Sequence, residues 1–151
     1  LRFPQSEGVS TPRGNIYSDR PHAVFFQALG HELVRGERVL VIPEINGVDA
    51  LFSVRSVSPL LDHLPGWLDD DREKELIARF EKNAPDAVVL FERALPEFEL
   101  RALGQGYGSS LMAWIQEHYR PVVTLTAGTI LRRRGPAAPA GIRDVSYNRP
   151  P

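Results

Sequence analysis

Two short, uninterrupted apolar runs constrain the fold of this chain more than any other feature. One is RVLVI at residues 38–42, which Pro43 stops, and the other is AVVLF at residues 87–91. Runs of this length are typical of strands, and continuous rather than alternating hydrophobicity is typical of parallel strands covered on both faces. We therefore expect two buried parallel strands at the centre of the domain.

Amphipathic segments alternate with these runs. Residues 18–36 predict a helix with Ser18 or Asp19 as its N-cap, Pro21 in its first turn and Gly36 at its end. The expected apolar face of this helix consists of Val24, Phe25, Ala28, Leu29 and Leu33.

Three further segments complete the order of elements. A short helix is expected from Val48 to Ser53, and a longer one over 69–86, which aspartates open and Pro85 closes. Another helix is expected from Ser109 to His118, and residues 121–134 predict two strands joined by a turn near Gly128. The core-facing residues of the two longer helices are expected to be Leu76, Ile77, Phe80, Leu111, Met112 and Ile115.

This alternation of helices and strands predicts the α/β class. We expect a small layered, Rossmann-like domain with a mostly parallel sheet of three to four strands and an antiparallel C-terminal edge strand. Residues 1–17 are expected to be an irregular entry segment, 18–134 a single α/β domain and 135–151 a Pro-rich, loosely ordered tail.

The composition narrows the classes of function. The 151 residues suffice for one core, and a net charge of −1 does not favour nucleic-acid binding. The chain has no cysteine, which excludes disulfides and thiolate metal sites. The four histidines make no metal-binding spacing, so no metal or other cofactor is expected. No apolar run reaches the roughly 20 residues of a membrane span. Because the sequence opens abruptly on Leu1, we expect a piece of a longer protein.

The glycine-rich stretch at 104–110, GQGYGSS, raises the question of a phosphate-binding loop. Its G-x-G-x-G spacing differs from the dinucleotide fingerprint, and it lacks the lysine of a Walker loop. We interpret it as a turn leading into a helix that Ser109 caps. An anion at the free N–H groups of that helix start remains the alternative.

Charged residues near strand ends supply the other candidates. Glu44 and Glu92 each follow a predicted strand and could share one edge for acid–base chemistry, although solvated carboxylates are the commoner case. Loop arginines can bind a phosphate or carboxylate, or can tie loops down through Glu97 or Asp49. No residue is assigned a catalytic role, and the candidate ligand-binding residues are Arg55, Arg93, Arg101, Gly104, Tyr107, Gly108 and Ser109.

Three segments together resemble a known family. They span residues 41–68, 83–98 and 101–122, and in this order they resemble the soluble C-terminal region of bacterial multi-spanning glycosyltransferases of the dolichyl-phosphate-mannose/aminoarabinose transferase type. Ala94 and Gly106 depart from the family pattern, which has polar residues there. The matching residues are Pro43, Arg55, Pro59, Pro85, Asp86, Arg93, Glu97, Phe98, Arg101, Gly104, Tyr107, Gly108, Trp114, Ile115, Tyr119, Pro121 and Val122.

The resemblance implies an extracytoplasmic domain of an enzyme that transfers sugar from a polyprenyl-phosphate carrier. The catalytic carboxylates of such enzymes lie between membrane helices, so this chain would be an accessory or acceptor-recognition domain at the outer face of the bacterial cytoplasmic membrane, inactive alone. Its partners would be its own membrane-embedded region and a lipid-linked sugar or acceptor.

Two other classes of function stay open. One is a stand-alone domain that binds a small anion or nucleotide-sugar at Gly104–Ser110. The other is a protein-interaction module with an exposed sheet edge at Thr129–Arg133.

Overall fold

The computed structural model describes residues 6–44, 47–60, 63–94, 96, 99 and 102–135. The strands are β1 (Glu7–Thr11), β2 (Gly14–Ser18), β3 (Arg38–Ile42), β4 (Arg55–Ser56), β5 (Ala87–Phe91), β6 (Tyr119–Leu125) and β7 (Gly128–Arg133). The helices are α1 (Arg20–Glu32), α2 (Val48–Phe52), α3 (Asp70–Lys82) and α4 (Ser109–His118).

The central sheet is mixed rather than mostly parallel, which corrects the expected Rossmann-like arrangement. Within the described residues it has five strands in the order β4-β3-β5-β7-β6. Only the β3–β4 and β3–β5 pairs are parallel, whereas β5–β7 and β7–β6 are antiparallel. The short turn between β6 and β7 allows only an antiparallel return, and β7 then lies beside β5.

The last strand is therefore not an edge strand, and Thr129–Arg133 is not an exposed edge. Strand β7 pairs on both sides and buries Ile130 and Leu131. Strand β6 forms the edge instead and is largely exposed. Pro121 suits this position because proline has no N–H to donate to a neighbouring strand.

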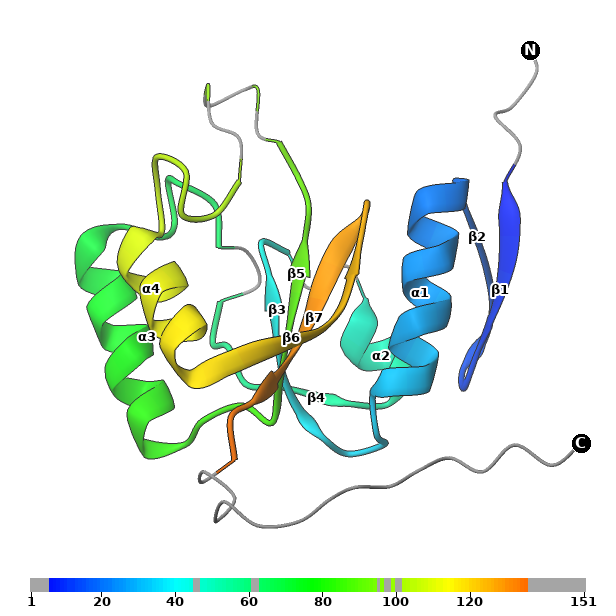
Figure 1. Ribbon diagram of the computed structural model, residues 1–151, viewed down its shortest axis with the longest axis horizontal. Coiled ribbons are helices and arrows are strands. Elements are labelled where there is room, and N and C mark those ends of the chain that lie inside the picture. The colour runs from blue at the N-terminus through cyan, green and yellow to red at the C-terminus, as the bar shows by residue number, and fades with distance from the viewer. Residues whose placement is uncertain are drawn as a thin grey trace, which may run out of the picture.

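Helices cover both faces of the sheet, with α3 and α4 on one side and α1 and α2 on the other (Figure 1). Successive residues of β3 alternate between the two cores. Leu40 packs with residues of α3 and α4, whereas Val39 and Val41 pack with residues of α1 and α2. This double coverage explains the uninterrupted apolar runs of β3 and β5, and it confirms that both strands are buried.

The starts of the helices agree with the local signals, whereas α1 and α3 end earlier than predicted. Helix α3 ends at Lys82, before the predicted Pro85. Asp19 caps α1 and accepts a hydrogen bond from the backbone N–H of His22 at 3.1 Å. That helix ends at Glu32, before the predicted Gly36. Val24, expected on the buried face, is 39% exposed, because the face that packs on the sheet centres on Phe25 and Leu29.

The amino-terminal residues form a hairpin where the sequence suggests an irregular entry segment. Strands β1 and β2 pair antiparallel and pack against α1, and Val9 of β1 is buried. Pro12 lies in the tight turn between them, and Gly14 follows with a φ of +132°. The loop-like punctuation of this segment is thus the turn of a hairpin. The tail from residue 136 onward lies outside the described residues.

Candidate functional site

The predicted ligand-binding residues do not converge on one place. Arg55 opens β4 at the amino end of the parallel strands, whereas the glycine loop before α4 lies toward the carboxyl end of β5 (Figure 1). Arg93 follows β5 and belongs to the carboxyl end as well. Arg101 lies outside the described residues. The candidates are therefore divided between the amino end and the carboxyl end of the parallel strands.

At the carboxyl end of the parallel strands, Glu44, which follows β3, forms an ion pair with Arg93, which follows β5. Glu44 thus faces an arginine, which argues against an acid–base pair with Glu92. Tyr107 is nearby and 8% exposed, and its hydroxyl has no hydrogen-bond partner in the described part of the chain. Burial raises the pKa of Tyr107, while the charge of Arg93 opposes that rise. The tyrosine therefore stays protonated and packs as part of the core.

The glycine stretch is a turn, as predicted. Gly104, Gly106 and Gly108 all have positive φ, and the N–H of Gly104 donates to the carbonyl of Tyr107 at 2.7 Å. A Cβ on Gly108 would lie 2.3 Å from Leu103 Cδ1, so no other residue fits without a shift. The prediction that Ser109 caps α4 is wrong. Gly108 takes the cap position, without a side-chain bond, and Ser109 is the first helical residue.

The amino end of α4 already holds an anion from the protein itself. The buried carboxylate of Glu73 accepts a hydrogen bond from the backbone N–H of Leu111, with 2.8 Å between Oε2 and N. The adjoining cavity is further lined by three aspartates and one lysine, Asp69, Asp70, Asp71 and Lys74. This negative surrounding disfavours a phosphate at the glycine loop.

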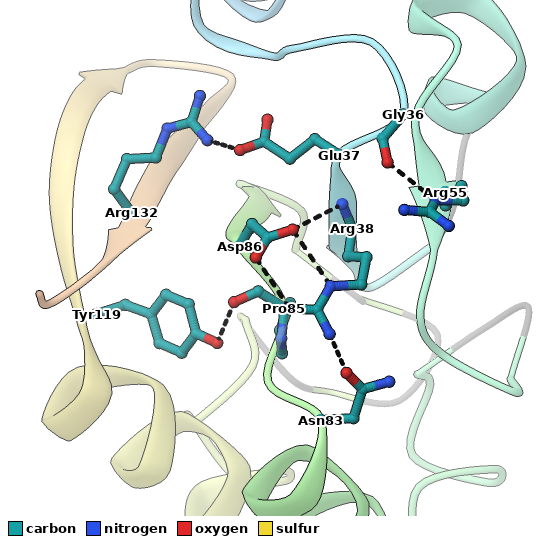
Figure 2. Close-up of polar contacts among 9 residues, drawn as sticks. All are labelled: Gly36, Glu37, Arg38, Arg55, Asn83, Pro85, Asp86, Tyr119 and Arg132. Carbon is teal, nitrogen blue, oxygen red and sulfur yellow. Dashed lines mark hydrogen bonds and ion pairs between the residues drawn. The ribbon is translucent and has the colours of Figure 1, made fainter.

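The amino end of the parallel strands carries a second charged cluster, centred on Arg38 and Asp86 (Figure 2). Arg38 Nη2 lies 3.0 Å from Asp86 Oδ1, and the backbone N–H of Arg38 donates to Oδ2 at 3.1 Å. The hydrogen bond from the Arg38 side chain lowers the pKa of Asp86, against the effect of partial burial. Arg38 also donates to the side-chain oxygen of Asn83.

Sequence reasoning missed Arg38, although a signal for it exists. Strands β3 and β5 pair in parallel from Val39 opposite Ala87, so the residues directly before them become neighbours. An arginine before one apolar run and an aspartate before the other therefore predict an ion pair, provided that the two runs are adjacent.

Two more hydrogen bonds connect segments at the amino end of the parallel strands (Figure 2). The hydroxyl of Tyr119, which is 1% exposed, donates to the carbonyl of Pro85 at 2.8 Å. Burial raises the pKa of Tyr119, so this hydroxyl stays protonated as a donor. Arg55 Nε donates to the carbonyl of Gly36 at 2.9 Å, so this arginine ties a loop to β4 through a backbone carbonyl rather than through Asp49.

Within the described ranges, no cluster of three or more His, Cys, Asp or Glu residues is arranged to hold a metal ion. The same residues include no helix that is both long and apolar enough to cross a bilayer. Comparisons with protein-family models, with curated proteins and with solved structures found no match to this chain.

Proposed function

We propose that this chain is an accessory or acceptor-recognition domain of a membrane glycosyltransferase that uses a polyprenyl-phosphate sugar donor. In this role it lies at the outer face of the bacterial cytoplasmic membrane and does not catalyse transfer alone. The proposal starts from the three sequence segments that resemble such enzymes.

The supporting observation is the hydrogen bond between Tyr119 and the carbonyl of Pro85. These residues come from two different segments of the resemblance and lie 34 positions apart in the sequence. Tyr119 also packs against Trp114, another matching residue, with 5.6 Å between ring centroids. The short motifs therefore form one framework that holds β5, α4 and β6 together, as motifs of a shared fold would.

The charged groups at the two ends of the parallel strands support a domain that does not catalyse transfer alone. Arg93 pairs with Glu44, Asp86 pairs with Arg38, and Glu73 binds the start of α4. Each of these charges stabilises the fold, and an acid, base or nucleophile in such a contact is held away from a substrate.

A transfer assay with a matched deletion tests this proposal. The full reading frame is expected to encode several apolar membrane spans, and its product to transfer sugar from a polyprenyl-phosphate donor. The present chain alone is expected to show no transfer, and removal of residues 18–134 from the full product to lower transfer or change acceptor preference. A reading frame without membrane spans, or transfer by the chain alone, would contradict the proposal.

A further inference from the structure

A cavity of about 370 Å³ opens at the amino end of the parallel strands. It lies between the starts of β3 and β4 and the last turn of α3, and its volume is within the range of small-ligand pockets. We call it the cationic pocket, because its lining includes Arg38, Arg55, Arg79 and Lys82. Ser56 and Asn83 contribute neutral polar groups, and Val57 and Phe80 contribute apolar ones.

The positive charge of the cationic pocket is largely uncompensated. Arg38 has a carboxylate partner in Asp86, but in the described part of the chain Arg55, Arg79 and Lys82 form no ion pair. Arg38 and Arg55 are also direct register partners on neighbouring strands. Like charges in that position destabilise a sheet, and a bound anion would offset the cost.

A neutral donor accompanies the charges. The side-chain oxygen of Asn83 accepts from Arg38, which leaves the amide NH₂ of Asn83 as a donor at the pocket. An amide N–H at the pocket can donate to an acceptor oxygen of a bound anion.

The helix dipole explains only part of this arrangement. Arg79 and Lys82 lie in the last turn of α3, where cations interact favourably with the carbonyl end of a helix. Arg38 belongs to β3 and Arg55 to β4, so these two arginines line the pocket independently of the helix.

We propose that the cationic pocket binds a phosphoryl group, either of a soluble phosphate ester or of an anionic lipid head group. A phosphoryl group matches the site because it has several acceptor oxygens and up to two negative charges, and arginine forks bind it in bidentate geometry. This inference depends on the pocket alone and not on the proposed glycosyltransferase function.

The first test is an NMR titration of the isotopically labelled chain with inorganic phosphate and pyrophosphate at low ionic strength. We expect saturable shifts of the Ser56, Val57 and Asn83 amides, and tighter binding of pyrophosphate. The double variant Arg79→Gln/Lys82→Gln is expected to bind about tenfold more weakly. Both side chains are exposed, so the variant is expected to fold.

The control variant is Lys74→Gln/Arg120→Gln, which removes the same charges elsewhere. Lys74 lies at the opposite end of α3, and Arg120 lies on the opposite edge strand, β6. Its affinity is expected to stay within about twofold of the original. Equal loss in both variants, or no saturable binding up to about 10 mM, would overturn the proposal.

Co-sedimentation with vesicles identifies the source of the phosphoryl group. Retention on phosphatidylglycerol vesicles but not on phosphatidylcholine vesicles, lost in the pocket variant and kept in the control, would identify a lipid head group. Binding of soluble pyrophosphate without vesicle retention would identify a soluble ester. The variant Asn83→Ala retains all charges and is expected to weaken either interaction, which separates a built site from general attraction.

Discussion

The carboxylate of Glu73 on α3 accepts a hydrogen bond from the backbone N–H of Leu111 in the first turn of α4. This contact joins residues 38 positions apart and places a buried negative charge at the positive end of a helix. The protein therefore uses one helix to cap another, at the position where the sequence suggests either a serine cap or a bound anion.

Glu73→Ala is expected to lower the free energy of unfolding by about 2 kcal/mol, because it leaves the buried N–H of Leu111 unsatisfied. Glu73→Gln keeps an acceptor oxygen and is expected to cost about half as much. Urea denaturation measures both. Glu75→Gln, an exposed change on the same helix, is the control, and a similar loss there would contradict the capping role.

Asp86→Asn is expected to remove a pH-dependent contribution to stability. Because Arg38 holds the pKa of Asp86 below its ordinary value of 3.8, the charged carboxylate favours the folded state. The contribution is complete above the unfolded pKa and is lost as pH falls through the lower folded pKa. We expect about 1 kcal/mol at neutral pH, since the carboxylate is 44% exposed and partly screened.

Urea unfolding from pH 7 down to about pH 3 measures this difference. The gap between the original chain and Asp86→Asn should narrow toward the acid end. Glu117→Gln, at an exposed position on α4, should show no such narrowing. A gap that stays constant with pH would show that the Arg38–Asp86 pair does not stabilise the fold through its charge.

Removing the hydroxyl is expected to have different effects on stability at the two buried tyrosines. Tyr119→Phe leaves the Pro85 carbonyl without its donor and should cost about 1–2 kcal/mol. Tyr107→Phe removes a hydroxyl that has no hydrogen-bond partner among the described residues, so the stability of this variant should be unchanged or slightly higher. Thermal unfolding of both variants, with a circular-dichroism check of the fold, gives the comparison. Equal losses would mean that the Tyr119 bond contributes nothing specific.

Gly108→Ala should destabilise the domain by more than about 1 kcal/mol. Gly108 has a φ of +64°, and an added Cβ would meet Leu103 Cδ1 at 2.3 Å. Gly66→Ala is the control, because no atom lies within 4 Å of its added Cβ and its φ is not positive. Differential scanning calorimetry should show a lower melting temperature only for Gly108→Ala, and an unchanged value would mean that the turn tolerates a side chain.

Local signals were sufficient for most of the elements. The apolar runs at 38–42 and 87–91 are β3 and β5 to the residue, and α4 has the predicted limits, Ser109 and His118. Strand length, helical periodicity and an aspartate cap depend on neighbours within a few positions, so they can be read along the chain. The hairpin at 7–18 was missed because Pro12 and Gly14 mark a tight turn as readily as a loop.

The candidate site was less predictable. The glycine loop was correctly interpreted as a turn, but its surroundings depend on Glu73, which lies on another helix. Arg55 was predicted, yet its neighbours in the cationic pocket were not, because they come from β3 and the end of α3. A residue's charge can be read from the sequence, but the charges around it depend on strand register and helix packing.

The sequence by itself determined where most of the strands and helices form and that β3 and β5 are buried, since hydrophobic periodicity is a local property. Only the tertiary structure decided that β7 enters the sheet between β5 and β6, which makes the sheet mixed. It also decided that Arg38 lies between Asp86 and Arg55. These pairings join segments distant in the chain, and they follow from burying every apolar face at once, a condition that no local pattern encodes.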